Sequence, residues 1–277
     1  MRYRTGKRNQ IFLATKFGAR GRDSPDNSVE YMRACIEKSL LRMGIDYIDL
    51  FYVHRVDKNM PIETTIKAMA ELVKEGKVRY LGLSEVAEGT LRRAHAIHPI
   101  AAIQVEYSPF CLEIEDPKVG LIKACRELGI TVVAYAPLGK GMLTGLYKCH
   151  EDIPATDFRR LLPKVPEAPI YCRFSNENFP NILKLVEVLQ TIGQKHNATA
   201  GQITLAWLLA QGPEIIPLPG TKTVKYLEEN VGAFNVHLSD GDIQQIREVA
   251  AHCNASSVGD RYPAFAMPYL MVDTVPL

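Results

Sequence analysis

The sequence predicts an α/β fold built from repeated, parallel strand and helix units. Short apolar segments rich in β-branched residues alternate along the chain with longer segments of helical periodicity. Most of the strand segments are continuous apolar runs, as expected when both faces of a parallel sheet are covered. Gly44, Gly76 and Gly129 each end a helical segment just before a strand, which repeats the order helix, glycine, strand.

Six segments are predicted as strands because each is apolar and bounded by turn-forming residues. They cover residues 11–16, 47–54, 78–84, 100–107, 130–136 and 214–218. Eight segments are predicted as helices because apolar residues recur every three or four positions. They cover residues 29–43, 63–74, 89–97, 120–128, 181–194, 198–211, 224–231 and 239–252. The units show no sequence self-similarity, which argues against a solenoid.

The composition indicates a globular protein with a substantial core. Of 277 residues, 47% are hydrophobic and 23% are charged, which excludes a disordered or collagen-like chain. Because α/β barrels of about 250 residues form one domain, we expect a single domain over residues 1–277. The formal net charge of +2 is too small to indicate a nucleic-acid-binding protein.

The six cysteines contain no CxxC pair, so we expect neither a zinc site nor a dithiol redox centre, but buried free thiols. No apolar stretch approaches the ~20 residues needed to span a bilayer. The basic start, from Met1 to Arg8, has no apolar signal-peptide segment behind it. These features predict a cytoplasmic protein that binds no metal and no membrane.

Two regions interrupt the alternation of strands and helices. Residues 140–180 form a long irregular excursion that carries five prolines, at positions 154, 163, 166, 169 and 180. A loop of this length often closes over a ligand, although a surface insertion without a role is the alternative. The tail, residues 254–277, is apolar and contains proline, and we expect it to pack over the mouth of the fold or against its side.

Polar side chains stand at the ends of the predicted strands, where active groups gather in βα folds. They are Lys16, His54, Ser84, Gln104, Tyr107 and Tyr135. A single buried lysine or histidine is more often structural, but several at neighbouring strand ends indicate a site. A lysine lowers the pKa of a nearby hydroxyl, and a neutral histidine hydrogen-bonds a carbonyl oxygen. Both effects assist the reduction of a carbonyl group.

Six collinear motifs accompany these residues. They are ATKFG at 14–18, DYIDL at 46–50 running into VHR at 53–55, GLSE at 82–85, QVEYS at 104–108, AYAPLGKGMLTG at 134–145, and PGTK at 219–222 with LEEN at 227–230. In this order and spacing the chain resembles the aldo-keto reductases from about residue 7 to residue 263. Together the six motifs are specific, whereas each alone is weak.

The resemblance implies a (β/α)8 barrel of the TIM type that binds NADPH without a Rossmann fold and transfers hydride reversibly to an aldehyde or ketone. In such enzymes a tyrosine donates the proton, a lysine and an aspartate assist it, and a histidine orients the substrate. By position, Lys16 and His54 match the lysine and the histidine, and are the predicted catalytic residues.

The same resemblance assigns the cofactor site. Ser84 and Gln104 match the groups that hydrogen-bond the nicotinamide carboxamide, with Glu85 beside Ser84, and Tyr135 matches the aromatic residue that stacks on the ring. The loop toward the diphosphate contributes Pro137, Leu138, Gly139 and Gly141. The adenosine and 2′-phosphate site comprises Gly220, Thr221, Lys222, Thr223, Glu229 and Asn230.

The chemistry of these residues agrees with part of the assignment. Glycines at 139, 141 and 145 allow the backbone to approach a phosphate, although ordinary loop flexibility explains them equally well. Lys222 and Lys225 favour the extra phosphate of NADPH over NADH. Thr223 and Ala136 depart mildly from residues frequent in the family, which weakens the expected affinity for the 2′-phosphate.

One part of the family pattern has no counterpart in this sequence. The aspartate and the acid tyrosine belong to a motif resembling D-T-A-x-x-Y-G, which does not occur here. At about 30 residues for a βα unit, the chain lacks the first two units of the barrel, roughly 60 residues. The six strands counted from periodicity give the same deficit. Tyr52 and Tyr3 are poor substitutes for the acid, since Tyr52 lies one layer deeper than His54 and Tyr3 precedes the first strand.

A barrel without two strands exposes strand edges and apolar core, which must be covered. The alternatives are an incomplete sequence, an element supplied by a second copy or another partner, and an open six-stranded sheet covered by the tail. We favour a shortened form of a complete enzyme, because the remaining motifs are largely intact.

The predicted function is the NADPH-dependent reduction of an aldehyde or ketone to an alcohol, impaired by the absence of the acid tyrosine and its aspartate. A non-catalytic NADPH-binding protein, regulatory or partner-binding, is the alternative. A chain that does not fold alone is a third interpretation, because the loss of two units can exceed the usual 5 to 15 kcal/mol of stability.

Overall fold

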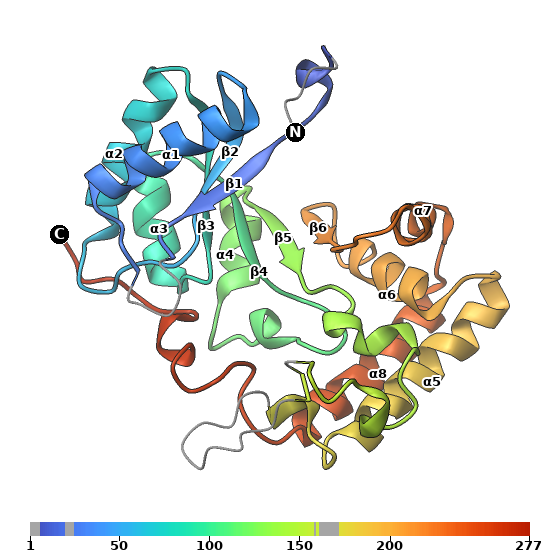
Figure 1. Cartoon of the computed structure of the whole chain (residues 1–277). Coiled ribbons are helices and arrows are strands. Elements are labelled where there is room, and N and C mark those ends of the chain that lie inside the picture. Colours follow the sequence, from blue (N-terminus) through green and yellow to red (C-terminus); the bar gives the residue numbers. More distant parts are fainter. Residues whose placement is uncertain (1–5, 20–24, 158, 161–171) are drawn as a thin grey trace. The chain divides into compact units, whose positions relative to one another are not determined.

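The computed structural model describes residues 6–19, 25–157, 159–160 and 172–277 (Figure 1). In this part of the chain the strands are β1 (Ala14–Phe17), β2 (Ile48–Val53), β3 (Val78–Ser84), β4 (Ile100–Glu106), β5 (Thr131–Tyr135) and β6 (Ile215–Leu218). Their order in the sheet follows their order along the chain. Neighbouring strands from β1 to β4 pair in parallel. The predicted parallel α/β fold is therefore confirmed.

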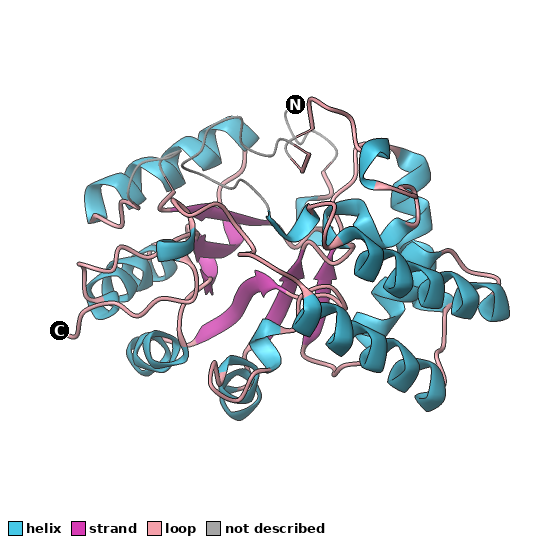
Figure 2. Cartoon of the chain, turned by 90° about the horizontal axis from the view of Figure 1, so that it is seen from below, coloured by secondary structure: helices cyan, strands magenta, loops and turns pink. Residues whose placement is uncertain are grey.

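Helices alternate with these strands in the first half of the chain and dominate the second half. Figure 2 shows the helices in cyan and the strands in magenta. The α-helices are α1 (Val29–Met43), α2 (Ile62–Lys74), α3 (Glu88–Ile97), α4 (Leu121–Leu128), α5 (Phe179–His196), α6 (Ala200–Leu209), α7 (Val224–Gly232) and α8 (Asp240–Ser256). Each corresponds to one predicted helical segment. Gly44 and Gly129 end α1 and α4 with φ of 66° and 67°, a left-handed conformation that glycine adopts without strain.

The predicted boundaries that differ from the structure include the start of the first strand, the end of the irregular excursion and the start of the tail. The first strand was predicted from residue 11, but β1 begins at Ala14, because a short helical turn at Arg8–Gln10 ends only at Ile11. The irregular excursion was predicted to run to residue 180, but Pro180 lies in the first turn of α5, where a helix requires no N–H from it. The tail was predicted from residue 254, but α8 continues to Ser256.

The chain divides into two compact units. Unit 1 comprises Met1–Gln104, Pro117–Val132 and Tyr269–Leu277, and unit 2 comprises Val105–Asp116 and Val133–Pro268. Unit 1 buries β2 completely and packs the apolar sides of α1 and α2, including Met32, Ile36 and Met69. Continuous burial of β2 explains why its sequence lacks the alternation of a half-exposed strand.

The last residues of the chain are integrated into unit 1. The N–H of Met271 donates to the carbonyl of Glu85 at 2.9 Å, and the N–H of Ala87 donates to the carbonyl of Val272 at 3.0 Å. Asp273 accepts hydrogen bonds from the backbone N–H and the hydroxyl of Thr90, at 2.9 and 2.8 Å. The tail thus packs where the chain leaves β3 and enters α3.

Unit 2 has its core around α5, α6 and α8. Trp207 of α6 is fully buried, and its ring centroid lies 6.0 Å from that of Tyr107. Its indole N–H donates to the carbonyl of Ile243 in α8. By contrast, α7 buries none of its residues. Exposed apolar side chains lie on β6, on α7 and just after α7, namely Ile216, Leu218, Val224, Leu227, Val231 and Phe234. The expectation that a partner or second copy covers part of the fold stays a prediction.

The cysteines only partly match the expectation of buried thiols. Cys111, Cys125 and Cys253 are buried, whereas Cys35 is half-buried and Cys149 is exposed. Among the described helices, none is both long and apolar enough to cross a membrane.

Candidate active site

Lys16 and Gln104 of unit 1 meet through their side chains. Lys16 lies near the end of β1, opposite Tyr52 of β2, and its Nζ donates a hydrogen bond of 2.8 Å to Oε1 of Gln104 in β4. The side-chain amide of Gln104 also hydrogen-bonds the hydroxyl of Tyr52. Burial, and then the charge of Arg55, lowers the pKa of the Lys16 ammonium. The lysine therefore loses its proton more readily than one in water.

The ring of Tyr52 is packed inside the sheet. Tyr52 is 1% exposed, and its ring occupies the space where a Cβ on Gly82 would lie. Glycine at position 82 of β3 is therefore required by this close approach. Burial raises the pKa of the Tyr52 phenol, which keeps its proton. The expectation that Tyr52 is a poor substitute for the acid stays a prediction, and Tyr3 lies outside the described residues.

His54 follows β2 directly, and its backbone N–H donates to the carbonyl of Phe17 at 2.6 Å. Burial lowers the pKa of the imidazole to about 4, with further contributions from the charges of Arg55 and Lys16. The ring is therefore neutral near pH 7. A neutral imidazole donates one hydrogen bond and accepts another, which suits contact with a carbonyl oxygen.

Ser84, Glu85 and Gln104 form a connected group at the ends of β3 and β4. The hydroxyl of Ser84 donates to the carbonyl of Gln104 at 2.7 Å, and Nη1 of Arg55 donates to that hydroxyl at 3.3 Å. Glu85 is fully buried with φ of 53°, an unfavourable conformation for a residue other than glycine. Its N–H donates to the carbonyl of Gln104, and its carbonyl accepts from Met271 of the tail. These bonds stabilise the strained turn.

Unit 2 contains a pocket of about 980 Å³. Nine of the predicted cofactor residues line it: Pro137, Leu138, Gly141, Gly220, Thr221, Lys222, Thr223, Glu229 and Asn230. The turn after β5 supplies the first three, the connection from β6 to α7 supplies residues 220–223, and α7 itself supplies Glu229 and Asn230. The volume falls in the range of about 300 to 1,000 Å³ typical of cofactor and ligand sites.

Lys222 is exposed at the rim of this pocket, and Gly220 has no atom within 4 Å of the place where a Cβ would lie. The hydroxyl of Thr223 caps α7 by accepting from the N–H of Tyr226 at 3.3 Å. Glu229 accepts a hydrogen bond of 2.8 Å from the hydroxyl of Thr199. Open backbone, a cation and the start of a helix are groups that bind phosphate.

Gly139 and Tyr135 do not line this pocket. Gly139 is buried with φ of 58°, and a Cβ there would lie 3.2 Å from both Phe110 and Leu143, so packing demands this glycine. Tyr135 ends β5, and its hydroxyl accepts a hydrogen bond from the hydroxyl of Tyr262 at 3.1 Å.

Sequence reasoning missed the residues that support the turn after β5. Nη1 of Arg159 donates to the carbonyl of Lys140 at 2.7 Å, and Nη2 donates to the hydroxyl of Tyr147 at 2.7 Å. Lys140, Tyr147 and Tyr226 also line the pocket. No local signal marks Arg159, because one arginine in an irregular segment is ordinary. The glycines on either side of Lys140 were a usable signal for a sharply turned loop.

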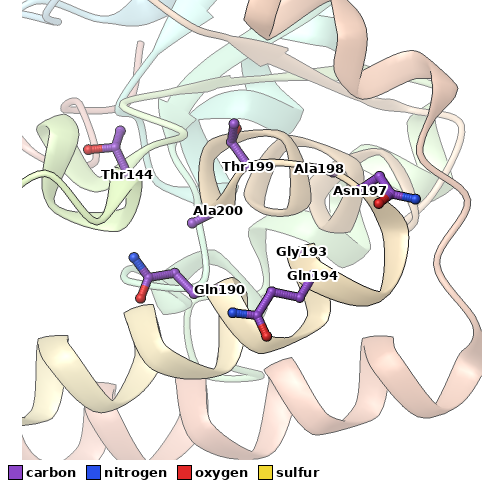
Figure 3. Close-up of a pocket in the computed structure, with 8 residues that line it drawn as sticks. All are labelled: Thr144, Gln190, Gly193, Gln194, Asn197, Ala198, Thr199 and Ala200. Atoms are coloured by element: carbon purple, nitrogen blue, oxygen red, sulfur yellow. The ribbon is translucent and has the colours of Figure 1, made fainter.

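A second, open and polar hollow of about 730 Å³ lies where α5 passes into α6 (Figure 3). Its polar side chains come from Thr144, Gln190, Gln194, Asn197 and Thr199. None of the predicted site residues lines it.

Comparison with known proteins identifies the family. A sequence model described as the aldo/keto reductase family matches residues 2–251. Aldo-keto reductase str7 of Strobilurus tenacellus is 58% identical over 89% of this chain and 70% of its own length. Aldo-keto reductase yakc of Schizosaccharomyces pombe, whose name specifies NADP(+), is 50% identical over 99% of this chain and 78% of its own length.

A solved structure also shares the fold. Glycerol dehydrogenase AKR11B4 of Gluconobacter oxydans matches 92% of this chain and 76% of its own, with a TM-score of 0.78 and 24% identity. The chain belongs to the aldo/keto reductase family and is an oxidoreductase. Its fold is of the TIM-barrel type, to which the described residues contribute six strands.

Proposed function

We propose that the chain binds NADPH and uses it to reduce an aldehyde or ketone to an alcohol. The observation that carries this proposal is the pocket of unit 2, which brings together nine predicted cofactor residues from two separate segments. The name of the relative from Schizosaccharomyces pombe, which specifies NADP(+), supports the choice of cofactor.

The residues of the pocket fit such a dinucleotide. The open backbone at Gly220 and the cation of Lys222 suit phosphate groups, while Leu218 and Tyr226 offer apolar surface. The cofactor, when bound, supplies hydride equivalents. We assign Lys222 and Thr223 to the 2′-phosphate, the turn at 137–141 to the diphosphate, and Ser84 and Gln104 to the carboxamide.

Lys16 and His54 are the proposed catalytic residues. The neutral His54 ring donates a hydrogen bond to the substrate carbonyl oxygen and polarises it. Lys16, with its lowered pKa and its bond to Gln104, favours the negative charge that develops on that oxygen. Glu85 and Tyr135 hold the cofactor in this proposal.

We further propose that proton donation limits turnover in this chain. The sequence contains no D-T-A-x-x-Y-G motif, and Tyr52 is 1% exposed. The same observation favours a second candidate function, an NADPH-binding protein without catalytic activity.

The test begins with NADPH, titrated against the purified chain and followed by quenching of intrinsic fluorescence. Addition of 4-nitrobenzaldehyde then tests turnover through the loss of NADPH absorbance at several enzyme concentrations. Saturable binding followed by aldehyde-dependent oxidation supports the reductase, provided that Lys16→Met and His54→Ala lose the oxidation and keep the binding. Binding without turnover supports the second function. A chain that binds no NADPH contradicts both.

A further inference from the structure

Tyr262 lies in the segment after α8 and contacts two parts of the proposed cofactor site in unit 2. Its hydroxyl donates to the hydroxyl of Tyr135 at 3.1 Å. Its ring lies under the ammonium of Lys140, with Nζ 4.1 Å from the ring centroid, a distance typical of a cation–π contact. Tyr262 therefore connects the residue that ends β5 to the turn that lines the pocket.

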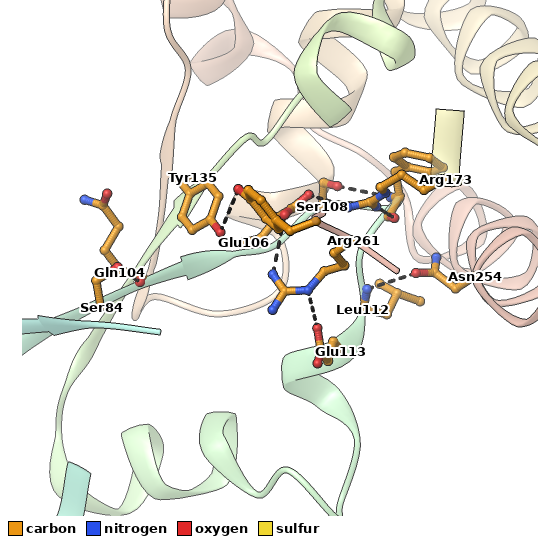
Figure 4. Close-up of polar contacts among 12 residues, drawn as sticks. Ser84, Gln104, Glu106, Ser108, Leu112, Glu113, Tyr135, Arg173, Asn254 and Arg261 are labelled. Atoms are coloured by element: carbon orange, nitrogen blue, oxygen red, sulfur yellow. Dashed lines mark hydrogen bonds and ion pairs between the residues drawn. The ribbon is translucent and has the colours of Figure 1, made fainter. Parts of the chain in front are cut away.

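The segment that carries Tyr262 is firmly anchored. The neighbouring Arg261 pairs through Nε with Glu113 at 2.5 Å and through Nη1 with Glu106 at 3.4 Å. Glu106 is 1% exposed and also pairs with Arg173 at 2.7 Å. Figure 4 shows Glu106 between the guanidinium groups of Arg173 and Arg261, and Glu113 beside that of Arg261.

A second attachment lies a few residues earlier. Asn178 and Val258 are joined by two hydrogen bonds of 2.8 Å. The side-chain amide N–H of Asn178 donates to the carbonyl of Val258, and the backbone N–H of Val258 donates to the side-chain oxygen of Asn178. The backbone is thus held before Tyr262 and at the adjoining Arg261. The position of the Tyr262 hydroxyl is consequently imposed by the fold.

Tyr135, by contrast, stands at the end of a strand. The following residue, Ala136, has φ of 50°, so the chain turns sharply away from the sheet directly after Tyr135. The ring of Tyr135 is half-buried, and its hydroxyl meets an anchored partner in Tyr262. A ring held at both its Cβ and its hydroxyl has little freedom to tilt or rotate.

We propose that Tyr262 is a positioning residue that acts through Tyr135, holding its ring in the orientation needed to stack on the nicotinamide ring of the cofactor. This inference rests on the proposed function, in which Tyr135 contacts the nicotinamide. Tyr262 itself does not touch the reacting atoms. Its contribution is preorganisation, which lowers the cost of ordering Tyr135 when the cofactor binds.

The test compares two ligands, NADPH and 2′-phosphoadenosine diphosphoribose, which lacks only the nicotinamide. Tyr262→Phe removes one oxygen atom and leaves the contact with Lys140. A neutral hydrogen bond of about 1 kcal/mol predicts roughly 5-fold weaker binding of NADPH, and binding of the analogue changed by less than about 2-fold. Isothermal titration calorimetry measures both dissociation constants.

Tyr135→Phe provides the second variant. Because each substitution removes the same hydrogen bond, Tyr135→Phe should weaken the binding of NADPH to a similar extent. The double variant should bind NADPH no more weakly than either single variant. Tyr80→Phe is the matched control, since Tyr80 is 50% exposed in unit 1 and belongs to no proposed site. It should bind both ligands as the unaltered chain does.

The outcomes separate the two proposals. An unaltered chain that binds neither ligand overturns the proposed function, and the inference with it. A chain that binds both ligands, while Tyr262→Phe leaves NADPH unchanged, overturns the inference alone. Equal weakening of both ligands, or additive effects in the double variant, also overturns it, because Tyr262 would then act on the pocket as a whole or independently of Tyr135.

Discussion

Lys16 and Gln104, 88 residues apart, are joined by a hydrogen bond of 2.8 Å that links the side chains of β1 and β4. The side-chain amide of Gln104 carries no charge, so it does not offset the effect of burial on the ammonium of Lys16. Burial therefore lowers the pKa of Lys16. The ionisation of the proposed catalytic lysine thus depends on the residue that stands at position 104.

Replacing Gln104 with glutamate should reverse this effect. A carboxylate at hydrogen-bond distance stabilises the ammonium, and we expect the pKa of Lys16 to rise by about 1 unit or more. NMR titration of the chain with 13C-methylated lysines measures the shift, and Lys16→Met assigns the signal. An unchanged or lower pKa in Gln104→Glu would show that the two side chains do not interact in solution.

His54 should make the stability of the fold sensitive to acid. Its pKa of about 4 in the folded chain lies below the ordinary value of 6.5, because burial disfavours the charged ring. As the pH falls from 6.5 to 4, the unfolded chain binds a proton that the folded chain does not bind, so the free energy of unfolding decreases across this window. Urea denaturation at several pH values measures the decrease.

His54→Gln supplies the comparison for this experiment, since its free energy of unfolding should fall less steeply over the same window. In NMR spectra of the unaltered chain, the ring signals of His54 should stay constant from pH 7 to pH 5. A ring that titrates near pH 6.5 would contradict the buried, neutral histidine.

Glu106 should be a major determinant of the stability of unit 2. It is 1% exposed and pairs with Arg173, which is 6% exposed, so Glu106→Gln leaves a buried cation without its counter-charge. We expect a loss of about 3 kcal/mol in the free energy of unfolding. The matched control is Glu127→Gln, since Glu127 is 45% exposed in its pair with Arg92 and should cost less than about 1 kcal/mol. Equal losses in urea denaturation would argue against burial as the cause.

The tail should stabilise α3 by capping it. The residue before α3 is Ala87, which offers no side-chain cap, and the carboxylate of Asp273 accepts the N–H of Thr90 instead. We expect Asp273→Ala to lower the free energy of unfolding by about 1 kcal/mol. Asp260→Ala, at an exposed position, should change it by less than about 0.5 kcal/mol. Indistinguishable urea midpoints for the two variants would refute the cap.

Lys222 should discriminate between the two nicotinamide cofactors. A charge-assisted hydrogen bond to the 2′-phosphate contributes about 1.5 to 3 kcal/mol to binding. Lys222→Ala should therefore raise the dissociation constant of NADPH by at least about 10-fold. NADH, which lacks that phosphate, should change by less than about 2-fold. Lys184→Ala, an exposed position on α5, controls for the loss of one positive charge. Parallel losses for both cofactors in fluorescence titrations would exclude this role.

Local pattern was sufficient for most of the fold. The helical spacing of apolar residues placed α1 at its observed ends, and the glycines that end α1 and α4 adopt the left-handed conformation that their position indicated. No sequence pattern indicated that the N–H of Leu13, just before β1, donates to the carboxylate of Asp49, 36 residues away. A long-range side-chain bond of this kind leaves no local trace.

The site was predictable to a similar extent. The ends of the predicted strands pointed to Lys16 and His54, whereas the predicted residues of the unit 2 pocket came from the resemblance to the aldo-keto reductases. Neither the strand ends nor the resemblance named Arg159, which holds the carbonyl of Lys140, or Tyr262, which meets Tyr135. These partners come from irregular segments, whose paths depend on what they pack against.

The sequence by itself determined the parallel α/β class, the order of the strands and helices, and the family to which the chain belongs, because apolar periodicity, glycine turns and motif spacing are local properties. The tertiary structure alone decided the ionisation of His54, the conformation of Glu85 and the use of Asp273 as a helix cap. Burial and contacts between distant residues set these properties, and both exist only once the chain has folded.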